Sequence, residues 1–142
     1  MSYGTAWRRA TAVDCLTVNR LLEAFGRTAT PEDFPPGDTT QVWMTDDGTA
    51  MFVIYFGRDT GRWTGHLTSI TVAPDARGRG LAKQAVSMAE HVARRFAADH
   101  HCKLRVFGYT NPDRKATIHI LEEAGWKRLS DGPETSLWAL DV

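Results

Sequence analysis

The chain has 142 residues, of which 42% are hydrophobic and 24% charged, and its acidic and basic residues balance to a formal net charge of zero. This length and composition predict one soluble globular domain over residues 1–142 with a sizeable core. No apolar run approaches the roughly 20 residues of a membrane span, and the first residues lack the basic-then-apolar order of a signal peptide. Cys15 and Cys102 stand in no metal-binding or redox spacing, so we expect reduced thiols, no metal site and a cytoplasmic protein.

The first half of the chain predicts a strand, a helix and a meander of three strands. Residues 3–11 alternate weakly, as an edge strand does, and Thr11 and Asp14 then have the spacing of a capping box. The helix that follows should end near Gly26, with these residues buried at helical spacing: Cys15, Val18, Leu21, Leu22 and Phe25. Residues 28–40 hold three prolines and a glycine and predict an irregular loop. The meander strands are expected at 41–45, 49–57 and 63–72, with turns at 46–48 and 58–62.

The second half predicts two helices and three strands. The first helix covers residues 79–97, with an apolar stripe formed by Leu81, Ala85, Met88, Ala89, Val92 and Phe96. A strand follows at 102–109, and a second helix lies within 111–125, with Asn111 as its N-cap and Pro112 in its first turn. Strands at 126–130 and 135–142 close the chain. The predicted order is therefore β-α-β-β-β-α-β-α-β-β.

Charge is unevenly distributed along the chain. Residues 28–57 carry five acids and neither Lys nor Arg, whereas residues 77–115 carry nine bases and three acids. These runs are either solvated faces or two sites of opposite preference, one for a cation and one for an anion. In the second interpretation, a pocket for a cationic amine would be formed by Glu32, Asp33, Phe34, Trp43 and Asp46.

The strongest motif is the stretch from Ser69 to Val86, "SITVAPDARGRGLAKQAV". An apolar β-branched strand ends at Pro74, a basic turn with two glycines follows, and a helix begins. The turn lacks the G-x-x-x-x-G-K-[ST] pattern of a P-loop. Lys83 stands where a dinucleotide fingerprint needs its third glycine or alanine. What remains is an R-x-x-G-x-A pattern from Arg77 to Ala82.

This pattern resembles the [QR]-x-x-G-x-[GA] signature of the GNAT superfamily of acyl-CoA-dependent N-acyltransferases. "ILEEAGW", which ends in Gly125 and Trp126, is similar to the family's second block, which usually ends in Gly-Phe. The resemblance covers most of the chain. It implies an α+β sandwich with a mixed central sheet of six to seven strands, flanked by three to four helices. The sheet would be splayed between the strands that end near Pro74 and Tyr109.

The resemblance implies that the turn binds the pyrophosphate of coenzyme A. The implied contacts are Arg77, Gly78, Arg79, Gly80, Leu81 and Ala82. Free backbone N–H groups and the dipole at a helix start favour an anion there. Backbone groups of Ile70, Thr71 and Val72 would contact the pantetheine arm and the thioester carbonyl. Arg114 stands where many members have Asn, and it could face coenzyme A phosphates or solvent.

N-acylation needs a neutral amine, so a base must take a proton from the acceptor, directly or through water. The family often places Glu or His on the strand before the signature, and His66 stands there. Strand alternation predicts that His66, Thr68, Ile70 and Val72 share one face of the sheet. The ordinary pKa of histidine, near 6.5, suits base catalysis at neutral pH. The alternatives are a structural histidine that is hydrogen-bonded on a half-exposed strand, and a proton route through water alone.

The leaving thiolate marks a departure from the family pattern. Many members carry a tyrosine acid four residues before the glycine of the second block, where this chain has Leu121. Tyr109 and His119 are candidate substitutes; the alternatives are a half-buried strand residue and a polar helix residue. A coenzyme A thiol is also acidic enough to leave without help.

These features together predict an N-acetyltransferase that moves an acetyl group from acetyl-CoA, its cosubstrate, to a primary amine on a small molecule or protein. The alternative is a non-catalytic acyl-CoA-binding or protein-interaction module. The zero net charge argues against a nucleic-acid partner, although the basic half leaves aminoacyl-tRNA open. No membrane partner is expected, and the closing strands offer an edge through which two copies could pair.

Overall fold

The computed structural model describes residues 6–110 and 114–142. Its strands form one sheet in the order β1-β2-β3-β4-β5-β7-β6, in which only β4 and β5 run parallel among the described pairs. The strands are β1 (Trp7–Arg9), β2 (Thr40–Thr45), β3 (Ala50–Asp59), β4 (Arg62–Val72), β5 (Arg105–Thr110), β6 (Lys127–Asp131) and β7 (Ser136–Asp141). The α-helices of the described residues are α1 (Cys15–Glu23), α2 (Leu81–Asp99) and α3 (Lys115–Glu123). This order confirms the predicted α+β architecture.

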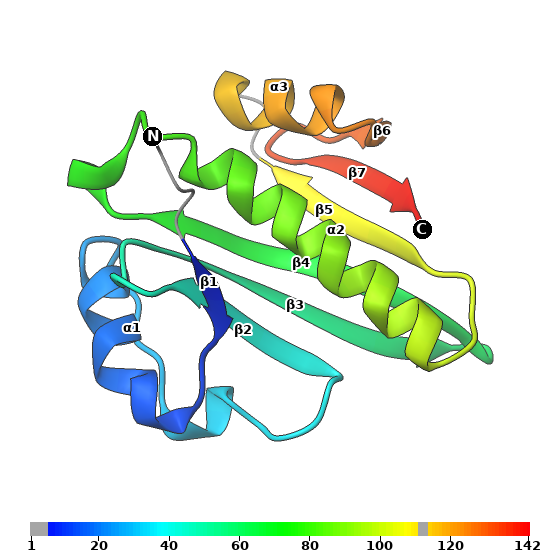
Figure 1. The fold of residues 1–142 in the computed structure, drawn as a ribbon. Helices are drawn as coiled ribbons and strands as arrows, with labels where there is room; N and C mark the ends of the chain where they lie inside the picture. The colour runs from blue at the N-terminus through cyan, green and yellow to red at the C-terminus, as the bar shows by residue number, and fades with distance from the viewer. Residues whose placement is uncertain (1–5, 111–113) are drawn as a thin grey trace.

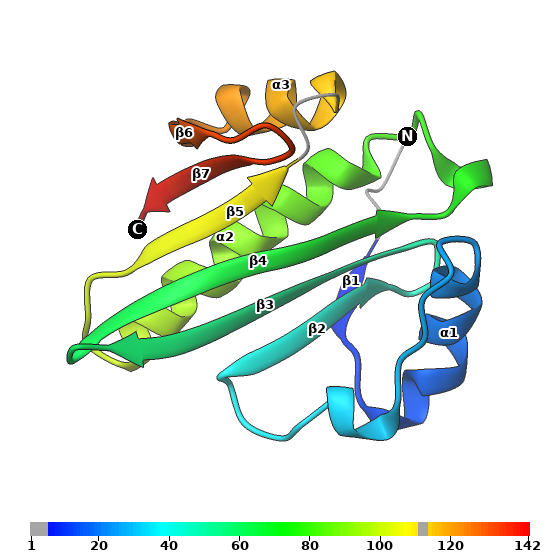
Figure 2. The same cartoon turned by 180° about the vertical axis from the view of Figure 1, so that it is seen from behind.

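The helices lie on opposite faces of the sheet, with α2 and α3 on one face and α1 on the other (Figure 1, Figure 2). Alternate residues of the central strands supply the two cores because successive side chains of a strand point to opposite faces. Phe52, Ile54 and Phe56 of β3 are buried against α2. Met51 of β3 is buried with Leu21 of α1. None of the helices in the described part of the chain combines the length and apolarity needed to span a membrane.

The capping residues that the sequence predicts cap the 3₁₀ turn Ala12–Asp14, which leads directly into α1. The backbone N–H of Thr11 donates to Asp14 Oδ2 over 2.9 Å, and Arg8 of β1 pairs with the same carboxylate at 2.7 Å. The hydrogen bond from Arg8 lowers the pKa of Asp14 from 3.8 to about 2. Phe25, predicted to be buried, is 36% exposed because it lies beyond the end of the helix at Glu23.

The meander strands are longer than predicted at the turn between β3 and β4. Thr60 and Gly61 have φ angles of 50° and 80° and form a two-residue connection, so Asp59 already pairs with Arg62. A hairpin of this kind matches the twist of its strands. The expected turn over 58–62 therefore shrinks to two residues.

The first residues of the two later helices, α2 and α3, also differ slightly from prediction. The helix expected to begin at residue 79 begins at Leu81, with Gly80 as its N-cap. The helix α3 begins at Lys115, and the predicted cap at Asn111 and Pro112 lies outside the described residues. Both helices otherwise follow the predicted order.

Candidate active site

The parallel pairing of β4 and β5 covers only part of both strands. Residues Thr64 to Leu67 pair with Arg105 to Gly108. The strand β4 then continues to Val72 and β5 to Thr110, so the two strands part beyond Leu67 and Gly108, as Figure 2 shows. The predicted splay is therefore present. Along it, β4 keeps β3 as its partner on one edge, through pairs that include Ile70 with Phe52 and Val72 with Ala50.

A bulge in β4 lies at the start of this splay. Ile54 pairs with Leu67 and Val53 pairs with Ser69, so Thr68 is an extra residue between the two pairs. Such a residue shifts the alternation of the strand. The prediction that His66 shares a face with Thr68, Ile70 and Val72 is therefore wrong. Ile70 packs into the α2 core, while His66 and Ser69 lie on the α1 face.

The basic turn after β4 is an exposed loop held between two buried residues. Ala76 and Leu81 are buried against Ala50, whereas the residues from Arg77 to Gly80 are exposed. Gly78 and Gly80 have φ angles of 81° and 74°, which favour glycine. A methyl group on either glycine would meet no heavy atom within 4 Å, so space lies open above the turn.

The backbone of this turn can bind an anion. The carbonyl of Gly80 accepts the first backbone hydrogen bond of α2, from Gln84 at 3.0 Å. The N–H groups of the preceding helical residues have no carbonyl within the helix and are directed to its N-terminal end. Arg79 Nε lies 3.4 Å from the carbonyl of Ala76, which keeps its guanidinium beside the turn. Lys83 instead lies 3.9 Å from Glu123 of α3.

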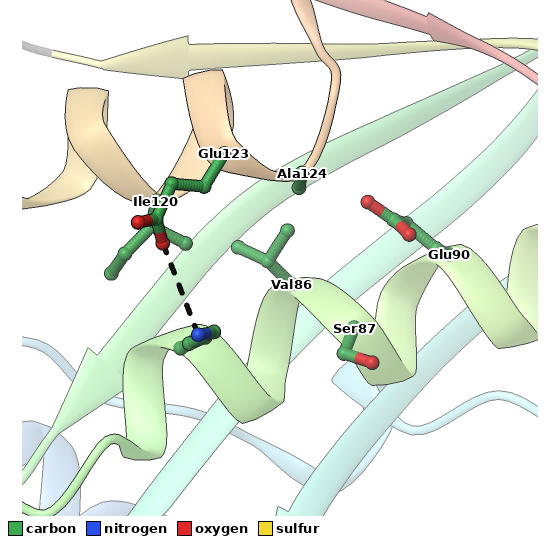
Figure 3. Close-up of a pocket in the computed structure, with 7 residues that line it drawn as sticks. Val86, Ser87, Glu90, Ile120, Glu123 and Ala124 are labelled. Carbon is green, nitrogen blue, oxygen red and sulfur yellow. Dashed lines mark ion pairs between the residues drawn. The ribbon is translucent and has the colours of Figure 1, made fainter.

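A groove continues from this end of α2 along the line between α2 and α3. It encloses about 550 Å³. Figure 3 shows Val86, Ser87 and Glu90 of α2 opposite Ile120 of α3 and Ala124, the C-cap of that helix, with the Lys83–Glu123 ion pair drawn across one end. Neither His66 nor Tyr109 is among its lining residues, so the groove is separate from the predicted catalytic pair.

His66 stands in a row of rings that crosses three strands on the α1 face. Its ring stacks on Tyr55 of β3 with centroids 4.6 Å apart and on Phe107 of β5 with centroids 5.6 Å apart. Its Nε2 lies 3.2 Å from the hydroxyl of Thr64. Burial lowers the pKa of His66 below its ordinary value of 6.5. The imidazole is therefore neutral at pH 7 and available to accept a proton.

The other predicted catalytic residues lie in contrasting positions. Tyr109 follows the last β4–β5 pair and is 58% exposed, on the same strand face as Phe107 and therefore as His66. Leu121, at the family's tyrosine position, is 4% exposed and packs in the α2 core. His119 is exposed and lies 3.0 Å from Glu123. Arg114 is exposed at the N-cap of α3.

The acidic segment does not form the pocket that was considered for a cationic amine. Its carboxylates are held in separate parts of the fold: Asp33 accepts from the N–H of Thr30 at 2.8 Å, Asp38 lies 2.7 Å from His100, and Asp46 lies 3.5 Å from Arg8. Trp43 packs on the α2 side of the sheet and Phe34 on the α1 side. Because these groups point to opposite faces, the interpretation of one shared pocket is wrong.

Tyr55, Thr64 and Phe107 are neighbours of His66 that were not predicted from the sequence. A two-residue turn at Thr60 and Gly61 would have placed Tyr55 opposite His66 by counting back along both strands. The position of Phe107 depends on the parallel register of β4 and β5, for which the sequence carries no local signal.

The chain matches the model of the acetyltransferase (GNAT) family over residues 17–126. It is similar in structure to Arabidopsis thaliana NAA60 in complex with a bisubstrate analogue, with a TM-score of 0.75, 11% identity, and coverage of 98% of this chain and 99% of that chain. The same protein in complex with acetyl-CoA gives a TM-score of 0.73 at 11% identity, covering 98% and 99%. A GNAT acetyltransferase from Streptococcus pneumoniae gives 0.74 at 13% identity, covering 98% and 100%. No curated protein matches the chain in sequence.

Proposed function

The chain belongs to the acetyltransferase (GNAT) family, and on this premise we propose that it transfers the acetyl group of acetyl-CoA to a primary amine by direct attack. The observation that carries the proposal is the continuity of β4. The same strand bears His66, parts from β5 directly after Leu67, and leads into the glycine turn at the start of α2. The proposed base, the open strand edge and the proposed anion-binding turn thus follow one another along a single segment.

Acetyl-CoA would bind along this segment. The backbone and side chains from Arg77 to Ala82 would hold its pyrophosphate, because the helix start offers free N–H groups and the two arginines add positive charge. Backbone groups of Ile70 to Val72 on the open edge of β4 would hold the pantetheine arm and the thioester carbonyl. The acetyl-CoA complex of the structurally similar NAA60 supports this choice of cosubstrate. Arg114, exposed at the start of α3, is free to approach the phosphates.

The transfer needs two proton movements. As the amine nitrogen attacks the thioester carbon, the new C–N bond forms and His66 takes the proton that the nitrogen loses. A backbone N–H of the β4 edge would stabilise the oxygen of the tetrahedral intermediate. The C–S bond then breaks, and Tyr109 gives a proton to the coenzyme A thiolate. His66 and Tyr109 lie on the same face of adjacent strands, His66 in the paired segment and Tyr109 directly beyond the last β4–β5 pair.

A thiol-release assay tests the proposal. With acetyl-CoA and a panel of small and peptide amines, we expect acceptor-dependent release of free coenzyme A thiol. Acetyl-CoA should also raise the melting temperature, and Arg79→Glu combined with Gly80→Glu should abolish that rise. Failure of both acetyl-CoA and coenzyme A to bind at millimolar concentration would refute the proposal.

A second candidate function is a non-catalytic acyl-CoA-binding or protein-interaction module. The buried Leu121 at the family's tyrosine position favours it, because that side chain cannot donate a proton. In this case acetyl-CoA would raise the melting temperature while no amine in the panel released thiol. Release with any acceptor would exclude the non-catalytic alternative.

A further inference from the structure

The ring nitrogens of His66 have different surroundings. Nε2 lies 3.2 Å from Thr64 Oγ1. Within residues 6–110 and 114–142, Nδ1 has no hydrogen-bond partner. A neutral imidazole carries a proton on one nitrogen and a lone pair on the other. The group that contacts Nε2 therefore determines which nitrogen can act as a base.

The hydroxyl of Thr64 has a second partner that fixes its direction. Its Oγ1 donates to the carbonyl oxygen of Gly57, on the neighbouring strand β3, over 3.5 Å. A carbonyl only accepts, and a threonine hydroxyl has a single proton. When that proton points to Gly57, the oxygen can only accept from Nε2. The chain of groups then runs from Nε2–H to the Thr64 hydroxyl and on to the Gly57 carbonyl.

We propose that Thr64 is a positioning residue that keeps the proton of neutral His66 on Nε2, so that Nδ1 is the atom that takes the proton from the acceptor amine. This inference rests on the proposed function. The amine proton moves to Nδ1, directly or through one water, while the Nε2–H bond to Thr64 is retained. Imidazolium, which carries both protons, thus keeps the same contact as the neutral ring.

The ring is also prevented from turning away from Thr64. Tyr55 stacks on one side with an interplanar angle of 14°, and Phe107 lies on the other side at 27°. A rotation about the side-chain bonds of His66 would have to displace one of these rings. The hydrogen bond selects the tautomer, and the two aromatic rings hold the orientation in which that bond forms.

Few charged groups face His66 from the packed elements. On β3, Tyr55 is the titratable group that stacks on the imidazole, and on β5, Tyr109 lies on the same face beyond the last β4–β5 pair. On β5, Arg105 pairs in register with Thr64 and is itself engaged with Asp141 of β7 at 2.7 Å. After α1, Arg27 donates to Ser69 Oγ over 3.1 Å on the same face. The hydroxyl of Thr64 is thus the polar group in direct contact with the imidazole.

Nitrogen-15 NMR of the full chain, labelled at histidine, tests the tautomer without acetyl-CoA or an acceptor. The His66 signals are assigned by their loss in His66→Gln. Above the titration of His66, we expect a protonated Nε2 and an unprotonated Nδ1 in the wild type and in Thr64→Ser. Thr64→Val should give a mixture of tautomers. Thr68→Val is the matched control, because Thr68 bonds to the Val53 carbonyl at 3.4 Å rather than to His66. It should leave the tautomer unchanged.

The kinetic consequence is measured with the amine that gives the highest rate of thiol release. Thr64→Val should lower kcat by less than the roughly 10²–10⁴-fold that a general base contributes, and it should move the acid limb of kcat/KM to lower pH. Thr64→Ser should restore both. A proton on Nδ1 in the wild type, or a tautomer unaffected by Thr64→Val, would overturn the inference. If no amine is acetylated, the proposed function fails even where the NMR result holds.

Discussion

The two halves of the candidate site are built in different ways. The glycine turn from Arg77 to Gly80 is a contiguous exposed loop, and the groups that we propose bind the cosubstrate there belong mainly to the backbone. The His66 row instead takes one ring from each of three strands, at a place where a bulge shifts β4. The cosubstrate side should therefore respond to changes in backbone geometry, whereas the acceptor side should respond to single side chains.

The largest effect is expected at His66. His66→Gln should lower kcat by about 10²–10⁴-fold, the usual contribution of a general base, and leave acetyl-CoA binding unchanged. Because burial lowers the pKa of His66, the acid limb of wild-type kcat/KM should fall below pH 6.5, and the variant should lose that limb. Steady-state kinetics across pH measure both.

The exposed His91 on α2 provides the control for this change. His91→Gln should retain the wild-type rate and pH profile. An unchanged acid limb in His66→Gln would show that another group takes the proton.

A smaller effect, on binding, is expected at the glycine turn. Gly80→Val should weaken acetyl-CoA binding by about ten- to a hundredfold, the equivalent of losing a hydrogen bond to a charged group. The reason is its φ angle of 74°, which a β-branched residue does not adopt without strain. Isothermal titration with acetyl-CoA measures the change.

Gly61→Val is the matched control. Gly61 has a φ angle of 80° and equally open surroundings, but it lies in the β3–β4 connection. The Gly61→Val substitution should reduce the stability of the protein to an extent similar to Gly80→Val and leave the affinity for acetyl-CoA unchanged. Equal loss of affinity in both variants would mean that strain, rather than the turn itself, affects binding.

A smaller effect, a decrease in kcat, is expected at Tyr109. Tyr109→Phe removes the hydroxyl from an exposed ring without changing the strand. We expect kcat to fall by about tenfold or less, at the low end for acid catalysis, because a coenzyme A thiol is itself acidic. Single-turnover rates of thiol release measure this step, and an unaltered rate would assign departure of the thiolate to the thiol alone.

The smallest effect on activity is expected at the Arg8–Asp14 pair, which lies outside both halves of the site. The lowered pKa of Asp14 means that its contribution to stability is complete above pH 3.8 and is lost as the pH falls towards about 2. Asp14→Asn should therefore lower the free energy of unfolding at pH 7 by about 2 kcal/mol, with kinetics unchanged. Urea denaturation at pH 7 and pH 3 measures it.

The difference between Asp14→Asn and wild type should shrink at pH 3. Asp59→Asn, at the exposed last residue of β3, is the control and should alter stability little at either pH. A constant difference at both pH values would contradict the assigned role of the Arg8 pair.

The contrast between the two halves also explains what could be predicted from the sequence. The glycine turn is local, so its place between a strand and a helix is predicted from the sequence, although the helix begins at Leu81 rather than at residue 79. The capping residues of the 3₁₀ turn before α1 are local too. The face of His66 depends on the bulge at Thr68, which no pattern of residues marks, and simple alternation therefore assigned the wrong neighbours. Its partners Tyr55 and Phe107 come from separate strands and follow only from register.

The acidic segment illustrates the same limit. Its carboxylates are close in sequence, which suggested one pocket. In the fold Asp38 lies at the end of α2, Asp46 beside Arg8 of β1, and Asp33 in the 3₁₀ turn at Pro31–Asp33. Proximity along a chain that reverses direction at every turn does not determine proximity in space.

A crystal structure with acetyl-CoA tests the central claim most directly. We predict that the pyrophosphate lies on the backbone of residues 77–82. We also expect the thioester to lie between β4 and β5 beyond Leu67 and Gly108, within one water of His66. Coenzyme A bound elsewhere, or a thioester carbon far from His66 with no bridging water, would contradict the central claim.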